Sequence, residues 1–441
     1  MGPAPVKVIG GGLAGPEAAW QLARQGVAVE LWEMRPRVFT PAHQTSALGE
    51  LVCSNSLKSE APNSAPWLLK QELRRGDSLL LACAAQAAVP GGQALTVDRV
   101  QFSAAIEAAL TALPQVSIRR EEATALPSDI TIIASGPLTS APLARVLAEL
   151  AGHEHLYFYD AISPIVEADS LDYERMYPGS RWGKGGDDFW NCPLDRAQYE
   201  QFRQAILEAD SYPLHAFEET GFFEACLPLE ELARRGPETL RFGPMKPVGL
   251  PDPRTGRPPY AAVQLRRENL RADSFNLVGF QNHLRFGAQA QILRLIPGLE
   301  RARIVRFGQV HRNSYLAAPA VLTERLQFRR NPRVWAAGQL CGTEGYVEAI
   351  ATGWLAGRFA AAEAQGRTLA PPPRTTALGS LLHYITASSA HGYAPANMTF
   401  DLLPPLETPV RDREQRHQRQ CARALTDCDA WLQPQREAVP A

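Results

Sequence analysis

The N-terminal segment shows a change in hydrophobic period that is typical of alternating strands and helices. An apolar run at 6–9 predicts a short buried strand, and a second run at 29–32 predicts another. Between them, apolar residues recur at helical spacing, with Ala18 and Leu22 on one side and Gln21 on the solvent side. This order of elements predicts two parallel strands joined by a helix.

Glycines in the predicted turn between the first strand and the helix give the first chemical signal. They have the G-x-G-x-x-G spacing, which allows a tight turn, close approach of the backbone to a pyrophosphate, and packing of the helix on the strand. An acidic residue ends the second strand, where a ribose hydroxyl needs an acceptor. The sequence therefore predicts a dinucleotide site, and the alternative is a glycine turn with a structural role only. The residues expected to contact the cofactor are Gly10, Gly11, Gly12, Leu13, Ala14, Gly15 and Glu33.

Two later segments are expected to return to this unit. Residues 129–136 and 333–339 are predicted as buried strands, and a glycine-containing segment and an Ala-rich helix through Glu363 follow the second. In FAD-binding folds a C-terminal strand and helix lie beside the N-terminal unit, and the helix N-terminus faces the electron-rich side of the flavin. Cofactor contacts are expected here from Gly338, Gly342, Thr343, Gly345 and Tyr346, and Cys341 is expected to lie near the flavin.

The region between these segments has a different composition. Residues 161–325 contain more aromatic residues and prolines, in short alternating or helical elements. We expect them to form a mixed α+β insertion domain that binds substrate, whereas 1–160 and 326–441 form a discontinuous FAD-binding domain. Residues 410–432 predict a charged helix. The expected fold class is thus α/β, with a Rossmann-type FAD-binding domain and an inserted second domain.

The overall composition is that of an ordinary globular protein. Of the 441 residues, 45% are hydrophobic and 21% are charged. No apolar run approaches the roughly 20 residues of a membrane helix, and the first strand begins too early for a signal peptide, so we expect a cytoplasmic protein. Seven cysteines without a CxxC pair indicate reduced thiols. Because no His or Cys cluster has metal-ligand spacing, we expect no metal site.

The charge balance gives no sign of a nucleic-acid partner. The formal net charge is −1 and the pI is near 6.8. Positive charge is nevertheless mostly arginine, which suits bidentate contacts with phosphate. It is concentrated at 234–235, 266–271, 329–333 and 411–423, although each cluster is also explained by a solvated surface.

Several of these segments together resemble a known family, the folate- and FAD-dependent tRNA uracil-5-methyltransferases of bacteria. The resemblance extends over nearly the whole chain. A related family of flavoproteins, which modifies the wobble uridine of tRNA, shares the opening but is longer and has an extra helical C-terminal domain. The segments that carry the resemblance are Gly10–Glu17, Glu33–Pro36, Thr40–His43, Val52–Ser59, Phe223–Glu230, Arg241–Gly249, His311–Asn313 and Gly338–Gly353.

The resemblance implies that a one-carbon unit passes from 5,10-methylenetetrahydrofolate to carbon 5 of the T-loop uridine of tRNA, with NAD(P)H as reductant and FAD as cofactor. Carbon 5 of uracil is a poor nucleophile, and addition of a thiolate at carbon 6 activates it. The resemblance assigns this thiolate to Cys226, and the thiol that removes the carbon 5 proton to Cys53. Both must then meet at one flavin face. A packed, unreactive thiol is the alternative, and it is the expectation for Cys83, Cys192, Cys421 and Cys428.

Further substrate contacts follow from the same resemblance. His311 and Tyr346 match positions near the folate and flavin rings, where an aromatic face can stack on a flat heterocycle. Lys246, Arg285 and Arg312 lie in matching segments and are candidates for contacts with folate carboxylates or tRNA phosphates. The alternatives are a surface histidine and a packed tyrosine. We expect a monomer, although the sequence does not determine the oligomeric state.

Two positions depart from the family pattern. Ala225 stands where glycine is expected, which strains the backbone if φ is positive there. Gly11 replaces the usual alanine, and we expect this change only to loosen the turn. Three alternatives stay open: a flavoprotein that modifies the wobble uridine, a small-molecule flavin dehydrogenase, and a flavin-containing RNA-binding or sensor protein without turnover.

Overall fold

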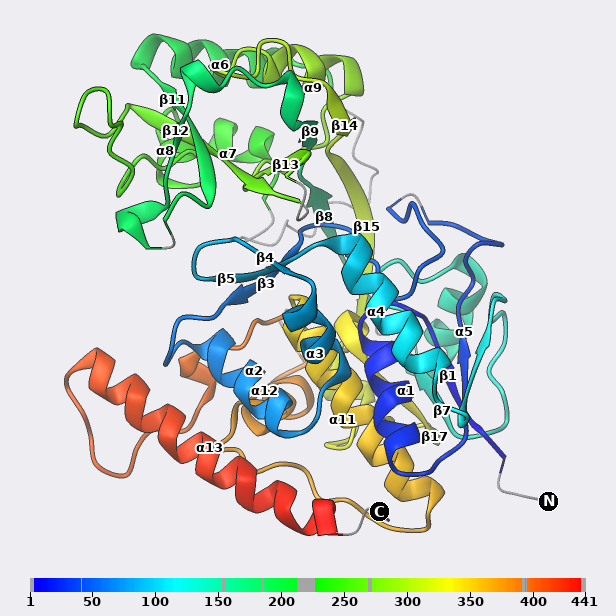
Figure 1. Cartoon of the computed structure of the whole chain (residues 1–441). Coiled ribbons are helices and arrows are strands. Elements are labelled where there is room, and N and C mark those ends of the chain that lie inside the picture. Colours follow the sequence, from blue (N-terminus) through cyan, green and yellow to red (C-terminus); the bar gives the residue numbers. More distant parts are fainter. Residues whose placement is uncertain are drawn as a thin grey trace.

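The chain forms two lobes, a larger lower one and a smaller upper one in the view of Figure 1. The structure is a computed structural model that describes residues 4–40, 42–152, 155–184, 186–211, 227–268, 272–390, 393 and 395–437. Within these ranges the side chains at 155–162, 309–314 and 436–437 are not described.

A six-stranded, mostly parallel sheet forms the centre of the lower lobe. Its strands, in spatial order, are β16 (Gln327–Phe328), β17 (Asn331–Ala336), β7 (Thr131–Ile133), β1 (Val6–Ile9), β2 (Val29–Trp32) and β6 (Val116–Arg119). All neighbouring pairs are parallel except β16 and β17. The α/β class predicted from the sequence is confirmed, because segments from both ends of the chain share this sheet.

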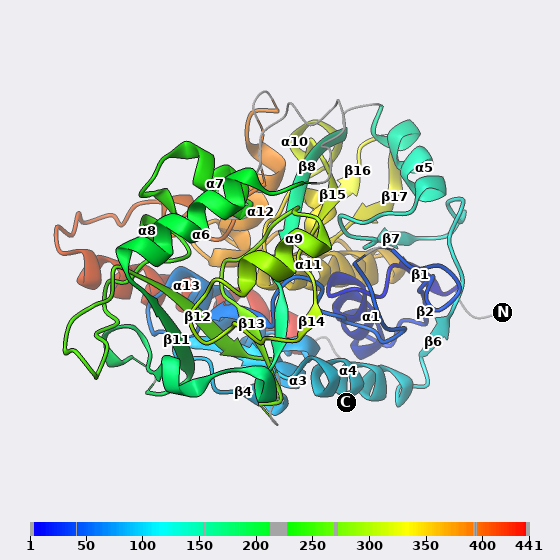
Figure 2. The same ribbon diagram turned by 90° about the horizontal axis from the view of Figure 1, so that it is seen from above.

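Helices surround this sheet, and two smaller pairings of strands lie beside it (Figures 1 and 2). A three-stranded sheet has the order β3 (Ser56–Ser59), β5 (Ala94–Val97) and β4 (Ala88–Val89). The helices are α1 (Ala14–Arg24), α2 (Ala65–Arg75), α3 (Leu79–Gln86), α4 (Arg99–Thr111), α5 (Ala141–Ala151), α10 (Ala318–Val321), α11 (Tyr346–Ala364), α12 (Ala377–Ala387) and α13 (Arg413–Glu437).

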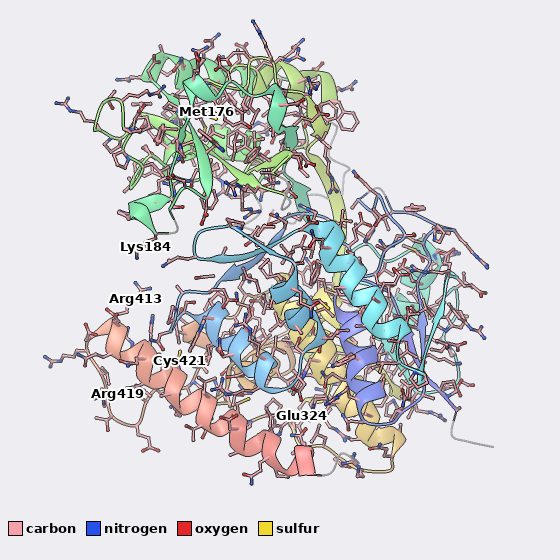
Figure 3. The ribbon with its side chains drawn as sticks, viewed as in Figure 1. Met176, Lys184, Glu324, Arg413, Arg419 and Cys421 are labelled. Carbon is pink, nitrogen blue, oxygen red and sulfur yellow. The ribbon has the colours of Figure 1, made fainter. Side chains whose placement is uncertain are left out.

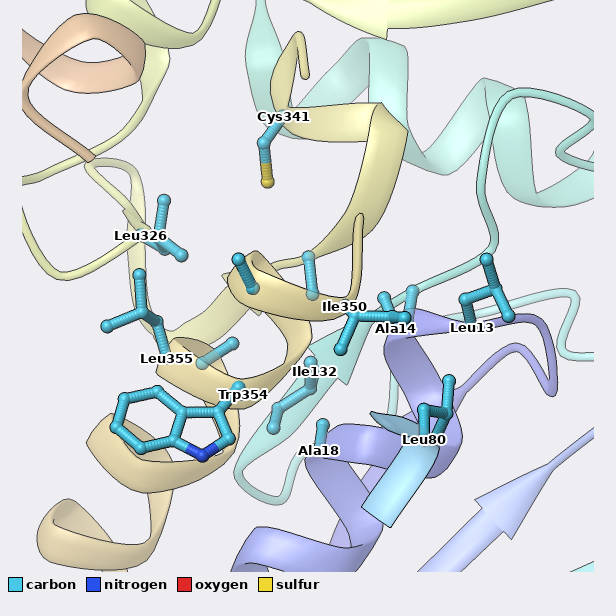
Figure 4. Close-up of a cluster of buried hydrophobic side chains, with 14 of the residues drawn as sticks. Leu13, Ala14, Ala18, Leu80, Ile132, Leu326, Cys341, Ile350, Trp354 and Leu355 are labelled. Carbon is cyan, nitrogen blue, oxygen red and sulfur yellow. The ribbon is translucent and has the colours of Figure 1, made fainter. Parts of the chain in front are cut away.

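The hydrophobic core of the lower lobe is centred on the packing of α1 against α11. Figure 4 shows Ala14 and Ala18 of α1 near Ile350 of α11 and Ile132 of β7, and all four side chains are buried. Small residues on α1 let the two helices approach closely, which increases the number of van der Waals contacts. The N-terminal and C-terminal parts of the chain are therefore one packed unit.

The prediction that Gln21 faces solvent is wrong. Its side chain is buried, because α1 is covered by neighbouring elements on more than the sheet side. The Gln21 Nε2 donates to Glu17 Oε1 at 3.0 Å and to the Asp77 carbonyl at 3.2 Å, and its Oε1 accepts from Arg358 Nη1 at 3.2 Å. These bonds replace the water contacts that the polar pattern suggested.

The upper lobe contains a second sheet, and its hydrophobic cluster is separate from that of the lower lobe. The pairs within this sheet are antiparallel. Its strands, in spatial order, are β10 (Tyr177–Pro178), β11 (Phe189–Leu194), β12 (Ala261–Arg267), β13 (Ser274–Leu277), β9 (Ile165–Glu167) and β14 (Ile304–Arg306). Its helices are α6 (Arg196–Glu208), α7 (Leu229–Arg235), α8 (Thr239–Phe242) and α9 (Phe286–Leu293).

Two long strands connect the lobes. β8 (His155–Ile162) and β15 (Gln309–Leu316) form an antiparallel pair, and they run side by side between the lobes in Figure 1. The chain enters the upper lobe along β8 and returns along β15. The exact domain boundaries expected from the sequence stay a prediction.

The C-terminal helix α13 carries the basic residues predicted for 410–432. Figure 3 shows Arg413 and Arg419 on the outer side of α13, and both are exposed, whereas Cys421 is buried. Burial raises the pKa of the Cys421 thiol to about 12, which fits a packed, protonated thiol. In the described part of the chain, no helix has both the length and the apolar character that a membrane span requires.

A buried carboxylate ties α2 to the start of α12. Both oxygens of Glu72 accept backbone N–H groups at this helix N-terminus, from Ala377 at 2.7 Å and from Leu378 at 2.8 Å. Burial raises the pKa of Glu72 to about 8, although the two N–H bonds act in the opposite direction. Burial likewise raises the pKa of Glu17 to about 7.

These two glutamates make the stability of the fold depend on pH. Between the ordinary carboxyl pKa and about pH 8, the folded protein holds a proton on Glu72 that the unfolded chain has released. The free energy of unfolding therefore falls as pH rises, by at most about 1.4 kcal/mol per pH unit for this group. A Glu72→Gln variant is expected to lose this part of the slope and to keep the part due to Glu17. Urea unfolding between about pH 6 and about pH 8 measures both slopes, and an equal slope in the variant would contradict the assignment.

Candidate active site

A cleft lies at the carboxyl ends of the central strands of the lower lobe. It contains about 1000 Å³ of empty space, part of which is open to solvent. Eight of the twelve residues predicted from the sequence to contact the cofactor line it, namely Gly10, Gly11, Gly12, Leu13, Ala14, Glu33, Gly338 and Tyr346. The other four, Gly15, Gly342, Thr343 and Gly345, are not among its lining residues.

Two helices begin at the cleft. Ala14, the first residue of α1, and Leu13 just before it line the cleft, and no side chain caps this helix N-terminus. Tyr346 and Ala349, in the first turn of α11, also line it. Because the first N–H groups of a helix have no partner within the helix, each start is suited to a negatively charged or electron-rich group.

Hydrogen bonds hold the Glu33 carboxylate against the glycine turn between β1 and α1. Its Oε2 accepts the Gly11 N–H at 2.8 Å, and its Oε1 accepts both the backbone N–H and the Nε of Arg35, at 2.9 and 2.7 Å. Burial opposes ionisation, but the bonds and charge of Arg35 keep the pKa of Glu33 below its usual range. Glu33 is therefore an anion at the cleft wall.

The structure has no room for a side chain at Gly11. A Cβ at this position would lie 2.5 Å from Leu48 Cδ2 and 2.6 Å from Glu33 Oε2. The sequence predicted only a looser turn. In the structure, the missing side chain also leaves the space that the Glu33 carboxylate and Leu48 occupy.

Three further residues that line the cleft with Glu33 were not predicted from the sequence. Arg35, His43 and Glu50 all line the cleft, and Arg35 Nη1 donates to Glu50 Oε2 at 2.7 Å. Burial, together with the charge of Arg35, lowers the pKa of His43 to about 4, so this histidine is neutral near pH 7. The available signal was that Arg35 and His43 lie in the segments that carry the family resemblance.

A loop that contains Cys53 adjoins the cleft. Val52 lines the cleft, and Cys53 is half-buried. The Tyr346 hydroxyl accepts two backbone N–H groups of this loop, from Cys53 at 2.8 Å and from Ser54 at 3.1 Å. Burial raises the pKa of Tyr346 above its usual range, so its hydroxyl stays protonated. The loop is therefore fixed to the start of α11.

The upper lobe holds the same loop from the other side. Asn55 is fully buried, and its Nδ2 donates to the Val97 carbonyl at 3.1 Å and to the Arg267 carbonyl at 2.9 Å. Arg266 Nη2 donates to Ser54 Oγ at 2.8 Å. The Cys53 loop thus contacts both lobes of the molecule.

Two further arginines approach this loop. The guanidinium of Arg99 donates to the carbonyl of Leu51 and, at 3.4 Å, to that of Cys53, while its Nε donates to Glu268 at 2.7 Å. Arg306 Nη2 donates to the carbonyl oxygen of residue 42 at 3.0 Å. Arg99 and Arg266 therefore bond the cysteine-bearing loop directly, and Arg306 bonds the segment that precedes this loop. Within the described ranges, no cluster of His, Cys, Asp or Glu could hold a metal ion.

Comparisons with known proteins point to one family. A sequence model of the family described as Glucose inhibited division protein A matches residues 5–368. The protein named Methylenetetrahydrofolate--tRNA-(uracil-5-)-methyltransferase TrmFO from Solibacter usitatus is 60% identical over 431 residues, which cover 96% of this chain and 97% of that protein. The chain belongs to the TrmFO family. A protein of the same name from Koribacter versatilis is 55% identical over 433 residues, 97% of this chain and 98% of that protein.

Solved structures agree with the fold of this TrmFO family member. GidA of Aquifex aeolicus in its form I crystal has a TM-score of 0.71 and 16% identity, and the match covers 99% of this chain and 77% of that chain. The form II crystal has a TM-score of 0.69 and 15% identity, with 99% and 74% coverage. At this level of identity the likeness establishes the two-lobed fold alone.

The remaining predicted site residues of this TrmFO family member lie outside the cleft or outside the described residues. Lys246 is half-buried between α8 and β12, and Arg285 precedes α9; neither lines the cleft. His311 and Arg312 belong to β15, and their side chains are not described. Cys226 and its neighbour Ala225 fall outside the described residues, so the meeting of the two thiols stays a prediction.

The expectation that Cys341 lies near the flavin stays a prediction. Its side chain is fully buried in the hydrophobic core, as Figure 4 shows, and it does not line the cleft. The physical reason is that the glycine segment turns its side chains inward: the Tyr393 hydroxyl donates to the Cys341 carbonyl at 3.1 Å and packs against Gly342. Cys83, Cys192 and Cys428 are also buried.

Proposed function

We propose that this TrmFO family member transfers the one-carbon unit of 5,10-methylenetetrahydrofolate to carbon 5 of the T-loop uridine of tRNA, giving 5-methyluridine, with FAD as cofactor and NAD(P)H as reductant. The observation that carries this proposal is the 60% identity, over 96% of the chain, to a relative whose name states that reaction. The cleft beside a cysteine-bearing loop supports it, because the chemistry needs a cofactor and a sulfur atom at the same base.

The residues of the cleft fit FAD. The uncapped start of α1, at Leu13 and Ala14, suits the pyrophosphate, and the Glu33 carboxylate suits a ribose hydroxyl. The start of α11, with Tyr346, suits the flavin end. When bound there, FAD would supply the redox chemistry, taking electrons from NAD(P)H and reducing the transferred carbon.

In the proposed chemistry, two cysteines act on the uracil ring. Cys226 adds through its thiolate to carbon 6, which moves electron density to carbon 5 so that carbon 5 can attack the methylene carbon. After the new carbon–carbon bond has formed, Cys53 takes the proton from carbon 5. The electron pair left on carbon 5 expels the nitrogen to which the methylene was bound, which leaves an exocyclic methylene on the ring. A hydride, which reduced FAD would supply, then converts this methylene to a methyl group, and departure of Cys226 as a thiolate restores the ring double bond.

The substrate contacts follow the same proposal. Tyr346, His311, Lys246, Arg285 and Arg312 would meet the flat rings and negative charges of folate and tRNA. The target base has to leave its stack before a sulfur can reach carbon 6. We propose that the protein acts in the cytoplasm, where its proposed tRNA substrate is present, and that it acts as a monomer.

Incubation of FAD-loaded enzyme with tRNA, NAD(P)H and methylene-labelled folate tests the function. Mass spectrometry should place the label on the T-loop uridine. A Cys226→Ala variant should reduce labelling by about a thousandfold or more, because the nucleophile is lost. Cys83→Ala, at a buried thiol of α3, is the matched control and should keep labelling. Wild-type enzyme that leaves this uridine unlabelled would defeat the proposal.

A further inference from the structure

The charge around the Cys53 loop is out of balance among the described residues. Arg99 is paired with Glu268, but Arg266 and Arg306 each make a single hydrogen bond, to neutral oxygens. Arg266 is 8% exposed, and its Nε has no hydrogen-bond partner. Glu268 is shared by Arg99 and Arg266, and the carboxylate near Arg306, Glu50, is already in another ion pair. The three arginines therefore outnumber the carboxylates near them, and because a buried cation is costly without an anion, this arrangement favours one further anion beside them.

We propose that this anion is the Cys53 thiolate, and that Arg99, Arg266 and Arg306 are positioning residues that keep the sulfur ionised and in place. The inference rests on the proposed function, in which Cys53 takes part in catalysis. It goes further by assigning three arginines to the reactivity of that thiol.

The geometry supports this assignment first. Arg99 bonds the Cys53 carbonyl, Arg266 bonds the Ser54 hydroxyl, and the Tyr346 hydroxyl accepts the Cys53 N–H. The loop is therefore held at three points within two residues of the sulfur. A thiol on such a rigid loop keeps a fixed position relative to the surrounding guanidinium groups.

The electrostatics point to the same sulfur. Burial lowers the pKa of Arg266 and of Arg306. The decrease is opposed first by Glu268 at Arg266 and by Tyr346 and Glu50 at Arg306, and then in both by negative charge on Cys53. For Arg99, burial is outweighed by Glu268, and negative charge on Cys53 again favours the charged form. A thiolate at Cys53 would therefore add to the negative charge that favours the charged form of all three arginines.

The other acidic groups near the loop do not balance its three arginines. Glu268 bonds Arg99 through one oxygen and also acts on Arg266, while Glu50 bonds Arg35. Tyr346 is kept neutral by burial. An ionised Cys53 therefore supplies the negative charge that remains to be balanced beside the three arginines, and it would be a better base for a carbon-bound proton than a neutral thiol.

Alkylation of Cys53 by iodoacetamide tests the proposal without tRNA or folate. The FAD-loaded protein is treated at a series of pH values, and the peptide that contains Cys53 is quantified by mass spectrometry. The rate should follow a titration with a midpoint well below the ordinary thiol value of about 8.5. Arg266→Met and Arg306→Met should each raise the midpoint by about one unit, because one nearby cation is removed.

Two further variants separate charge from structure. Arg266→Lys keeps the positive charge and should leave the midpoint close to that of the wild type, whereas loss of packing alone would affect Lys and Met alike. Arg303→Met, at an exposed residue just before β14 that pairs with Glu167 and Asp169, should not move it. If Arg266→Met does not fold, Arg306→Met decides the outcome, because that guanidinium makes one hydrogen bond only.

A wild-type midpoint at the ordinary thiol value, or an unchanged midpoint in Arg266→Met and Arg306→Met, would overturn the proposal. Failure of the labelling experiment on tRNA would leave the alkylation result standing, since the alkylation depends only on the state of the sulfur. The two proposals are therefore tested separately.

Discussion

A Gly10→Ala variant is expected to lose most of its affinity for FAD. Gly10 has a φ of +112°, and a Cβ there would lie 2.6 Å from the Ala134 carbonyl carbon and 2.8 Å from Ser135 Cα. The methyl group would push the turn away from β7 and displace the start of α1 from the cleft. Strain of about 1–3 kcal/mol at such a position corresponds to a roughly tenfold to hundredfold higher dissociation constant. Fluorescence titration of cofactor-free protein with FAD measures it.

Gly26→Ala is the matched control for this variant. Gly26 also has a positive φ, of +74°, but no atom lies within 4 Å of a Cβ at that position. This variant should lose about 1 kcal/mol of stability from backbone strain and keep its affinity for FAD. Equal affinities in Gly10→Ala and the wild type would show that the close approach to β7 does not shape the cofactor site.

An Arg35→Met variant is expected to be destabilised by about 3–5 kcal/mol near pH 7. The Arg35 side chain is almost fully buried, and it forms ion pairs of 2.7 Å with both Glu33 and Glu50. Methionine fills a similar volume but leaves two carboxylates without their cation. Urea unfolding of both proteins measures the difference in the free energy of unfolding.

The pH dependence of this loss identifies its cause. The lowered pKa of Glu33 contributes stability that is present above the ordinary carboxyl pKa and is lost as pH falls. The gap between wild type and Arg35→Met should therefore narrow toward pH ~4. Arg35→Met combined with Glu33→Gln should recover part of the stability at neutral pH. A gap that does not change with pH would assign the loss to packing instead.

The nucleotide-binding unit could be predicted closely from the sequence because its signals are local. Strand, glycine turn, helix and the acidic end of β2 follow one another within a short segment, and the structure has them in that order. Gln21 shows the limit of this reasoning. A helical pattern gives one polar side, but it does not reveal that Asp77 and Arg358, from remote segments, supply the partners of a buried amide.

The candidate site could be predicted only where the family motifs carried it. Cys53 lies in such a motif, whereas Arg99, Arg266 and Arg306 come from α4, β12 and β14, and nothing local in the sequence brings them together. From the sequence, the cluster that contains Arg266 and Arg267 suits either phosphate binding or a solvated surface. Alternation along a strand instead directs Arg266 toward the loop, and the backbone of Arg267 binds Asn55.

The antiparallel pair formed by β8 and β15 has a consequence for how this architecture can vary. The chain leaves and re-enters the larger lobe at neighbouring points. The smaller lobe is therefore an insertion that is connected to the larger lobe by one two-stranded ribbon. The size and surface of the smaller lobe can differ among relatives while the strand connections of the parallel sheet stay the same. A chimera that exchanges this lobe at the ribbon would therefore preserve the connectivity of the host.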